Sequence, residues 1–344
     1  MLKIKDLKTS FFTSQGEVKA VRGVSFSVKE GEIVGLVGES GSGKSVSCMS
    51  ILRLLPENAK ITGGEISFEG RDLTKLSGRE LRKIRGGKIA MIFQDPMSSL
   101  NPLIRVGTQV EAMIRVHQPE KSREERRREA LELFRRVRIP EAEKRCRSFP
   151  HEFSGGMRQR IMIAMALANR PALLIADEPT TALDVTIQDQ ILKELRALRK
   201  EYRTGIIFIT HDLSVVAELC DRVEVLYGGL IMEEAPIDAV FSSPYHPYTM
   251  GLLNSIPQLG QDRSRRLVPI PGSPPDMTNP PKGCPFAPRC PYARMLCAEE
   301  LPDFYEVGRG HRSRCWLLDE EAPGENNPFS KRADRNLRSS DQAM

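Results

Sequence analysis

Residues 38–45 read Gly38-Glu39-Ser40-Gly41-Ser42-Gly43-Lys44-Ser45, which matches the pattern G-x-x-x-x-G-K-[S/T] in full. Glycines let backbone amides curl around phosphate oxygens without a clash from a Cβ atom. The Lys44 ammonium can reach the β- and γ-phosphates of a nucleotide, and the Ser45 hydroxyl can ligate Mg²⁺. An apolar run at residues 32–37 precedes the motif, and a helical pattern at residues 44–55 follows it. This strand, loop and helix predict an α/β fold with a nucleotide site.

Short apolar runs elsewhere in the chain predict the other strands of a parallel sheet. Each run is bounded by polar or turn residues, and they lie at residues 88–93, 172–177, 206–210 and 222–227. Uninterrupted apolar runs of this length are typical of strands buried on both faces. Between the first two runs, residues from about 95 to 170 form a mostly helical insertion, which predicts a helical subdomain. The β-like runs near the N-terminus, such as Val24 to Val28, predict an antiparallel β subdomain.

The composition is that of a globular protein with two unequal domains. The chain has 344 residues, of which 40% are hydrophobic and 28% are charged. No apolar stretch reaches the roughly eighteen residues that a membrane span requires. The first residues, MLKIKDLKTSFF, lack the apolar core of a secretory signal. We therefore expect a cytoplasmic protein whose cysteines are reduced.

The net charge of +6 does not by itself indicate a nucleic-acid-binding protein. Between Lys121 and Arg147 the basic residues are interleaved with glutamates, a pattern typical of a solvated helix. A nucleic-acid-binding face is the alternative interpretation of this run. It lacks the aromatic residues that would stack on bases, so we expect no nucleic-acid partner.

Two adjacent carboxylates end one of the predicted strands. Residues 173–178 read Leu-Leu-Ile-Ala-Asp-Glu, and successive side chains of a strand point in opposite directions. Asp177 and Glu178 should therefore have different roles. We expect Asp177 to hold Mg²⁺ directly or through water, and Glu178 to polarise the water that attacks the γ-phosphate.

A third motif lies shortly before these carboxylates. Ser154-Gly155-Gly156 is followed by Met157-Arg158-Gln159-Arg160, and this ordered set of motifs resembles the ABC ATPase family over residues 1 to about 240. The resemblance implies a P-loop NTPase core and two such domains that meet head to tail. Ser154, Gly155 and Gly156 would then contact the ATP of the partner domain, as the N-terminus of a helix suits an anion. The family usually has glutamine where this chain has Met157.

The same resemblance implies roles for residues outside these motifs. Gln94 corresponds to the family's coupling glutamine near Mg²⁺ and the attacking water. His211 corresponds to the histidine that contacts the γ-phosphate, and Asp184 lies in the loop that contacts the partner domain. Phe11 or Phe12 matches the position of the aromatic residue that stacks on adenine; ordinary packing is the alternative for both.

Two longer segments narrow the resemblance to importers of peptides and nickel. They are Gln94-Asp95-Pro96-Met97-Ser98-Ser99-Leu100-Asn101-Pro102 and Pro244-Tyr245-His246-Pro247-Tyr248-Thr249. The resemblance to ATP-binding subunits of oligopeptide/dipeptide importers implies an ATPase on the cytoplasmic face of the membrane. The implied partners are two permease subunits, an external substrate-binding protein and a second, related ATPase subunit. The alternatives are a nickel importer of the same family and a soluble ABC ATPase that acts on ribosomes or DNA.

The character of the chain changes after Phe241, where prolines become frequent. We expect a nucleotide-binding domain at residues 1–243, a small Cys-rich C-terminal module at residues 244–318, and a disordered tail at residues 319–344. The module carries four cysteines: Cys284, Cys290, Cys297 and Cys315.

A segment this small cannot form a large hydrophobic core, so we expect a cross-link to stabilise it. A reducing cytoplasm disfavours disulfides. Four thiolates suit either an iron-sulfur cluster or tetrahedral zinc. The segments Cys284-Pro285-Phe286 and Pro288-Arg289-Cys290 resemble the C-terminal module of oligopeptide/dipeptide ATPases, which implies a [4Fe-4S] cluster. Zinc and free thiols are the alternatives. His246 and His311 are further possible ligands, and a structural role is the alternative for both.

Overall fold

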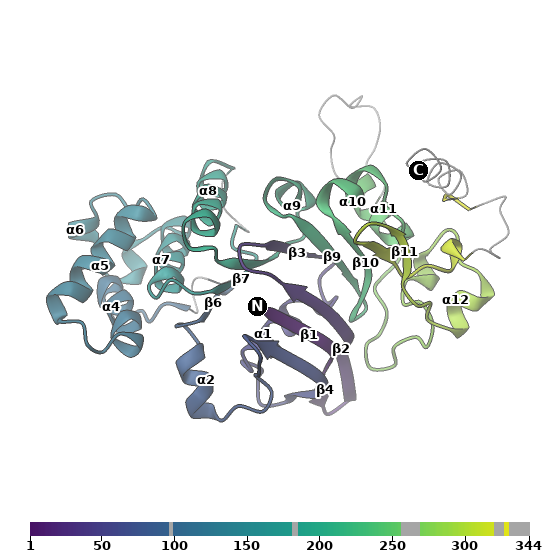
Figure 1. Ribbon diagram of the computed structural model, residues 1–344, viewed down its shortest axis with the longest axis horizontal. Helices are drawn as coiled ribbons and strands as arrows, with labels where there is room; N and C mark the ends of the chain where they lie inside the picture. Colours follow the sequence, from purple (N-terminus) through teal and green to yellow (C-terminus); the bar gives the residue numbers. More distant parts are fainter. Residues whose placement is uncertain (96–98, 181–184, 256–268, 320–326, 330–344) are drawn as a thin grey trace.

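The computed structural model describes residues 1–95, 99–180, 185–255, 269–319 and 327–329 (Figure 1). The N-terminal part forms a four-stranded antiparallel sheet in the order β2-β1-β4-β5. Its strands are β1 Leu2–Thr13, β2 Gly16–Val28, β4 Ala59–Phe68 and β5 Arg71–Asp72. The antiparallel β subdomain predicted from the sequence is therefore confirmed.

The second sheet has eight strands in the order β11-β12-β10-β9-β3-β8-β7-β6. All neighbouring pairs from β9 to β6 are parallel, and these five strands are the apolar runs identified in the sequence. They are β3 Ile33–Val37, β6 Ile89–Ile92, β7 Leu173–Asp177, β8 Gly205–Ile209 and β9 Arg222–Tyr227. Every residue of β3, β7 and β8 is buried, as expected for strands covered on both faces.

Alternating side chains of these strands enter two different cores. On one face, Leu173 and Ile175 pack with helix α1 Lys44–Ile51 and the antiparallel sheet. On the other face, Leu174 and Ala176 pack with helices of the opposite layer. The helices of that layer are α7 Gly155–Leu167, α8 Val185–Tyr202 and α9 Leu213–Leu219. This alternation sends Asp177 toward α1 and turns Glu178 away from it.

Helices occupy the chain between β6 and β7, where the sequence predicts a helical insertion. Besides α7 they are α4 Val106–His117, α5 Arg123–Arg136, α6 Ala142–Arg145 and a short 3-10 turn at Pro150–Glu152. Ser122 begins α5 with a capping box, because its hydroxyl accepts from the Glu125 N–H and Glu125 bonds back to the Ser122 N–H. Figure 1 shows α4 to α6 at one end of the molecule, far from the C-terminal elements. Helix α2 Gly78–Ile84 lies before β6.

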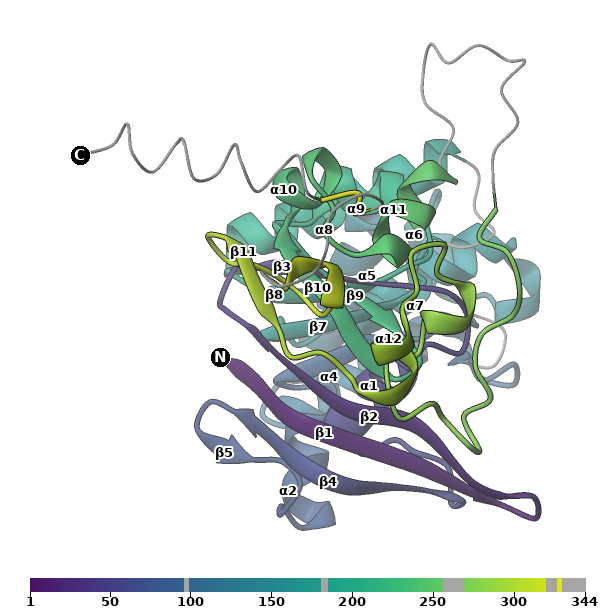
Figure 2. The same ribbon diagram turned by 90° about the vertical axis from the view of Figure 1, so that its right-hand side faces the viewer.

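The C-terminal residues differ from the separate module expected from the sequence, because they extend the main sheet. Strand β12 His311–Ser313 pairs antiparallel with β10 Leu230–Pro236, and β11 Tyr305–Gly308 pairs with β12 (Figure 2). The remaining short elements are α10 Ile237–Ser242, α11 Pro247–Asn254, α12 Met295–Glu299 and 3-10 turns at Ala287–Arg289 and Trp316–Leu318.

Buried polar contacts hold this added edge of the sheet in place. The Glu233 carboxylate accepts from the backbone N–H groups of Tyr245 and His246, at 2.7 and 3.0 Å, and lies 2.7 Å from His311 Nε2. Phe329 is buried against Tyr245, so part of the segment predicted as a disordered tail is packed. Residues 320–326 and 330–344 of that tail lie outside the described residues.

Within the described ranges, no helix has both the length and the apolar character that crossing a membrane requires.

Candidate nucleotide-binding and active site

The phosphate loop, residues 38–43, links the end of β3 to the start of α1. Its backbone requires glycine at two positions. Gly38 has a φ of +147°, and a Cβ atom there would lie 2.2 Å from the Leu226 carbonyl oxygen. Gly43 has a φ of +100°, and a Cβ atom would lie 2.6 Å from the Ala20 carbonyl oxygen. Neighbouring strands β9 and β2 therefore determine how tightly the loop turns.

Lys44 places a positive charge within this loop. Its Nζ atom donates to the carbonyl oxygens of Gly38 and Glu39, at 2.7 and 2.9 Å, and to Ser42 Oγ at 3.3 Å. Burial lowers the pKa of Lys44, and the nearby carboxylates of Glu178, Asp177 and Glu39 act in the opposite direction. The ammonium is thus held at the loop, where it can exchange carbonyl partners for phosphate oxygens.

Ser45 and Asp177 meet beside the loop. Ser45 Oγ donates to Asp177 Oδ1 at 3.0 Å, although the two residues are 132 positions apart. Burial raises the pKa of Asp177, while the hydrogen bond from Ser45 opposes the shift. A hydroxyl and a carboxylate are the hard oxygen donors that Mg²⁺ takes beside nucleotide phosphates. These residues therefore fit a magnesium ion bound with ATP.

Glu178 lies between the two other residues expected to be catalytic. Gln94 Nε2 donates to Glu178 Oε2 at 2.9 Å, and His211 Nδ1 lies 3.5 Å from Glu178 Oε1. The three residues follow the carboxyl ends of β6, β7 and β8, the edge of a parallel sheet where ligands bind. Glu178 has a φ of +47°, which is uncommon for a residue other than glycine and is often found at functional sites.

The Ser154-Gly155-Gly156 segment forms the start of α7. Ser154 is the N-cap residue, and its Oγ accepts from the Met157 N–H at 3.4 Å. Ser154 and Gly155 are exposed, so a second molecule has access to them. One contact went unrecognised in the sequence: buried Gln159 donates from Nε2 to the Pro179 carbonyl at 2.5 Å, which joins α7 to the residue after Glu178.

The other residues predicted to contact ATP have fewer contacts that indicate their role. Phe12 is 46% exposed on β1, with Lys60 Nζ 6.0 Å from its ring centroid, whereas Phe11 is half-buried. The exposed ring is the better placed of the two for stacking on a base. Asp184 lies outside the described residues, as do residues 96–98 of the segment after Gln94.

The four C-terminal cysteines line one cavity of about 20 Å³, together with His246, Phe286 and Trp316. Burial raises the pKa of Cys284 to about 12 and of Cys290 to about 11. The cavity takes about one water-sized group. Four thiols are a suitable donor set for a cluster or zinc, yet the described part of the chain contains no group of three or more His, Cys, Asp or Glu residues placed to hold a metal ion.

The two histidines proposed as further ligands have structural contacts instead. His246 is buried at the N-cap of α11, where its Nδ1 accepts from the Tyr248 N–H at 3.0 Å. Burial lowers the pKa of His246 to about 3. His311 is paired with Glu233 between two strands. Both rings therefore stabilise the C-terminal fold.

An apolar groove of about 520 Å³ lies beside the site, next to the strand that ends before Gln94. Its lining includes Met91, Phe93, Ser99, Met162 and Met165. Phe93 is exposed, although it adjoins a buried strand. Methionine-rich grooves adapt to the apolar face of a helix.

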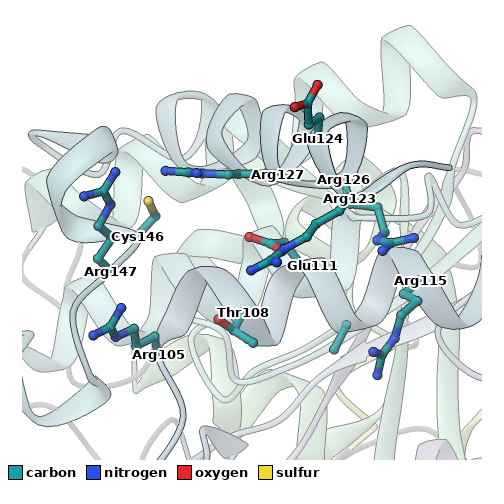
Figure 3. Close-up of a pocket in the computed structure, with 11 residues that line it drawn as sticks. Arg105, Thr108, Glu111, Arg115, Arg123, Glu124, Arg126, Arg127, Cys146 and Arg147 are labelled. Atoms are coloured by element: carbon teal, nitrogen blue, oxygen red, sulfur yellow. The ribbon is translucent and has the colours of Figure 1, made fainter.

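A separate cavity of about 740 Å³ lies in the helical region, lined by side chains from α4, from α5 and from the residues after α6 (Figure 3). Its arginines are accompanied by Glu111 and Glu124, and none of the eleven lining residues is aromatic. Elsewhere on α5, Arg135 pairs with Glu143 and Arg136 with Glu201. The ion pairs on α5 agree with the solvated helix expected from the sequence, whereas six arginines against two glutamates make the cavity itself predominantly basic.

Together, the parallel sheet, the phosphate loop and the convergent groups at the ends of β6, β7 and β8 define a phosphate-loop ATPase. Comparison with known families gives two matches: "ABC transporter" over residues 21–181, and "Oligopeptide/dipeptide transporter, C-terminal region" over residues 232–297. The chain belongs to the oligopeptide/dipeptide branch of the ABC transporter ATP-binding proteins, and it is an ATPase. The resemblance to this family seen in the sequence is confirmed.

Individual relatives agree over nearly the whole chain. The probable peptide ABC transporter ATP-binding protein y4tR of Sinorhizobium fredii is 52% identical over 321 residues, which cover 93% of this chain and 96% of the relative. The oligopeptide transport ATP-binding protein OppD of Bacillus subtilis is 52% identical over 324 residues, covering 94% and 90%. Among solved structures, the dimeric ATP-binding cassette MJ0796, bound to ADP and Pi, is 33% identical with a TM-score of 0.64, covering 69% of this chain and 99% of that one.

Proposed function

We propose that this chain energises the uptake of dipeptides and oligopeptides through an ABC importer on the cytoplasmic face of the membrane. The observation that carries the proposal is the Glu178 carboxylate, which contacts Gln94 and His211 and directly follows Asp177 beside the phosphate loop. The names of the relatives, which are peptide transport ATP-binding proteins, support the substrate class.

The proposed reaction is hydrolysis of ATP by an in-line water. The phosphate loop amides and Lys44 neutralise the β- and γ-phosphates. Ser45 and Asp177 would hold Mg²⁺, which would supply charge stabilisation at these phosphates. Glu178 orients and polarises the water, with Gln94 and His211 positioning its carboxylate. Separating these tasks between Asp177 and Glu178 lets one carboxylate bind the cation while the other serves the water.

We propose that hydrolysis requires a second ATPase subunit, related to this one. Ser154 and Gly155 are exposed and Gly156 is half-buried at the N-terminus of a thirteen-residue helix, where backbone N–H groups and the helix dipole favour a phosphate. The dimeric state of MJ0796 supports this arrangement. We assign Asp184 to the same interface on the family pattern alone.

The apolar groove beside Gln94 is the proposed docking site for a short helix of one permease subunit. It adjoins both Phe93, which precedes Gln94, and Met162 on α7, which begins at Ser154. A helix seated there would contact the elements that carry the water-positioning and partner-binding groups. Closure of the ATPase pair would then move the permease.

The test is gentle affinity purification of the chain from native membranes, followed by mass spectrometry. We expect two permeases, a second ATPase and a peptide-binding protein. The substrate is then tested by ATP hydrolysis in vesicles containing that complex, which should rise with added peptide. Stimulation by nickel alone would favour the nickel importer, and recovery of ribosomes or DNA without a permease would contradict the importer.

We also propose that Cys284, Cys290, Cys297 and Cys315 hold a [4Fe-4S] cluster. The support is the cavity that all four cysteines line, and the family match over residues 232–297, which covers the first three of them. Because the cavity is small, the thiols must separate to admit a cluster. Iron and acid-labile sulfide measured on anaerobically purified protein test this; stoichiometric zinc, or four alkylatable thiols without iron, would contradict it.

A further inference from the structure

Glu39, the second residue of the phosphate loop, forms a two-pronged ion pair with a residue of the C-terminal region. Arg289 Nη1 lies 2.5 Å from Glu39 Oε2, and Arg289 Nη2 lies 3.0 Å from Glu39 Oε1. The Arg289 side chain is 5% exposed and that of Glu39 is 29% exposed. Two parallel hydrogen bonds between charged groups specify direction as well as distance. The pair therefore determines where the Glu39 side chain lies.

Other contacts hold the Arg289 guanidinium in a single place. Nη1 also donates to Tyr227 Oη at 3.0 Å, and Nε donates to the Pro271 carbonyl at 2.7 Å. Nη2 donates to the Ile270 carbonyl at 3.2 Å. The guanidinium also lies over the ring of Phe286, 5.9 Å from its centroid. An arginine with this many partners acts as a rigid support.

A second C-terminal residue holds the backbone of Glu39. The Glu39 N–H donates to Tyr248 Oη at 2.7 Å, and the Tyr248 ring packs against Tyr227 with centroids 4.6 Å apart. The Glu39 carbonyl accepts from Lys44. Thus the N–H, the carbonyl and the carboxylate of Glu39 all have specific partners, and two of the three come from beyond residue 243.

Charge gives the ion pair a consequence for ATP binding. A carboxylate in a phosphate loop repels the nucleotide phosphates, because like charges a few ångströms apart interact unfavourably where water is partly excluded. Arg289 neutralises this carboxylate and turns it toward the C-terminal region. Lys44 is then the charged side chain of the loop that phosphate meets.

We propose that Arg289 is a positioning residue for ATP binding, which holds Glu39 and the phosphate loop in the conformation that accepts the nucleotide. The C-terminal region is on this view a working part of the nucleotide site. The inference deepens the proposed function, on which it rests only for the identity of the nucleotide. The protein's affinity for ATP is therefore the quantity to measure.

The test compares variants of the purified full chain, titrated with Mg²⁺ and an ATP analogue that carries a fluorescent ribose. We expect Arg289→Ala to weaken ATP binding about tenfold. The substitution removes the charged hydrogen bonds to Glu39 and leaves its carboxylate uncompensated beside the negatively charged phosphates. The ATP affinity of Arg289→Lys should fall between those of wild type and Arg289→Ala, because an ammonium restores the charge without the two-pronged geometry. In ATP hydrolysis by the complex that includes the second ATPase subunit, the KM should rise with little change in kcat.

Two further variants separate positioning from general stability. Adding Glu39→Gln to Arg289→Ala should recover part of the affinity, because it removes the uncompensated charge. Arg312→Ala breaks the ion pair of Arg312 with Glu234, between β12 and β10, and should leave ATP affinity unchanged. Thermal unfolding of each variant checks its fold.

Equal ATP affinity of Arg289→Ala and wild type would overturn the inference. It would also be overturned if Arg289→Ala lost affinity and melted at a lower temperature, and if adding Glu39→Gln restored none of that affinity. Failure of the wild-type chain to bind ATP would instead contradict the proposed function. If Arg289→Ala does not fold, Arg289→Lys and Glu39→Gln carry the comparison, and wild-type affinity in both would equally overturn the inference.

Discussion

Two regions of the eight-stranded sheet contain acidic residues with different roles: its antiparallel edge and the carboxyl ends of its parallel strands. At the antiparallel edge, the carboxylate of Glu233 is fully buried and bonded to two backbone N–H groups and to His311. At the carboxyl ends of the parallel strands, Glu178 contacts Gln94 and His211; its own side chain is 16% exposed, and that of His211 is 64% exposed. Burial with complete hydrogen bonding makes the first site structural. Access from solvent lets the second exchange its partners for a substrate.

Arg289 connects these two regions. It ends the 3-10 turn Ala287–Arg289 of the C-terminal region, and its guanidinium binds the phosphate loop. The two regions therefore differ in the roles of individual acidic residues, but residues of both contribute to the ATP-binding site.

The largest expected effect is at Glu178, because this substitution tests most directly whether Glu178 is catalytic and Glu233 structural. We expect Glu178→Gln to lower the rate of ATP hydrolysis about a thousandfold, because the amide cannot polarise water as a carboxylate does. Binding of Mg²⁺ and ATP should remain, since Ser45, Asp177 and Lys44 are unchanged. Phosphate release and nucleotide binding are the two measurements. Glu218→Gln, at an exposed pair with Arg196, is the control; near-normal turnover of Glu178→Gln would make Glu178 as structural as Glu233.

A second prediction concerns the stability of the phosphate loop. Gly38→Ala should lower the free energy of unfolding by about 3 kcal/mol, because its Cβ would overlap the Leu226 carbonyl. Gly78→Ala is the matched control: it lies in the first turn of α2, and a Cβ atom there meets no atom within 4 Å. Urea denaturation of both variants measures the difference. Equal stability would mean that β9 yields and does not constrain the loop.

The nucleotide site was largely predictable from the sequence, because its residues lie in short motifs whose chemistry is local. Gly38 to Ser45 form one turn, and Asp177 and Glu178 end one strand. The Glu39 contacts were not predictable in this way, since Tyr248 and Arg289 are 209 and 250 residues away. Both lie in segments noted for their resemblance to the family, but an isolated tyrosine or arginine has no periodicity that indicates its partner.

The C-terminal strands escaped prediction for a different physical reason. Strand β12 has three residues and β11 has four, too few for an alternating pattern to be recognised. Their pairing with β10 depends on buried contacts such as His311 with Glu233, which join residues 78 positions apart. The cysteines indicated a compact segment, but the sequence did not indicate that this segment adds strands to the main sheet.

A smaller effect is expected at the adenine end of the site, where the sequence left two candidates. Phe12→Ala should raise the KM for ATP about tenfold, in line with the loss of one stacking contact. Phe11→Ala should have a smaller effect on the KM, because its ring is half-buried in the subdomain. Steady-state hydrolysis measured over a range of ATP concentrations tests both. A larger effect of Phe11→Ala would reverse the assignment, and no effect of either would place the adenine contact elsewhere.

The smallest expected effect is at Met157, where the chain departs from the usual signature. The hydrogen bond that caps α7 runs from the Met157 backbone N–H to Ser154 Oγ, so it does not depend on the side chain. The Met157 side chain is half-buried against the core of the helical layer. Met157→Gln should therefore change kcat/KM for ATP by less than about twofold, as a substitution outside the polar contacts does. Ser154→Ala, which removes the cap itself, is the informative partner variant. If Met157→Gln altered turnover as strongly as Ser154→Ala, the side chain at position 157 would have to reach the partner's nucleotide, and the exposed helix start alone would not account for the interface.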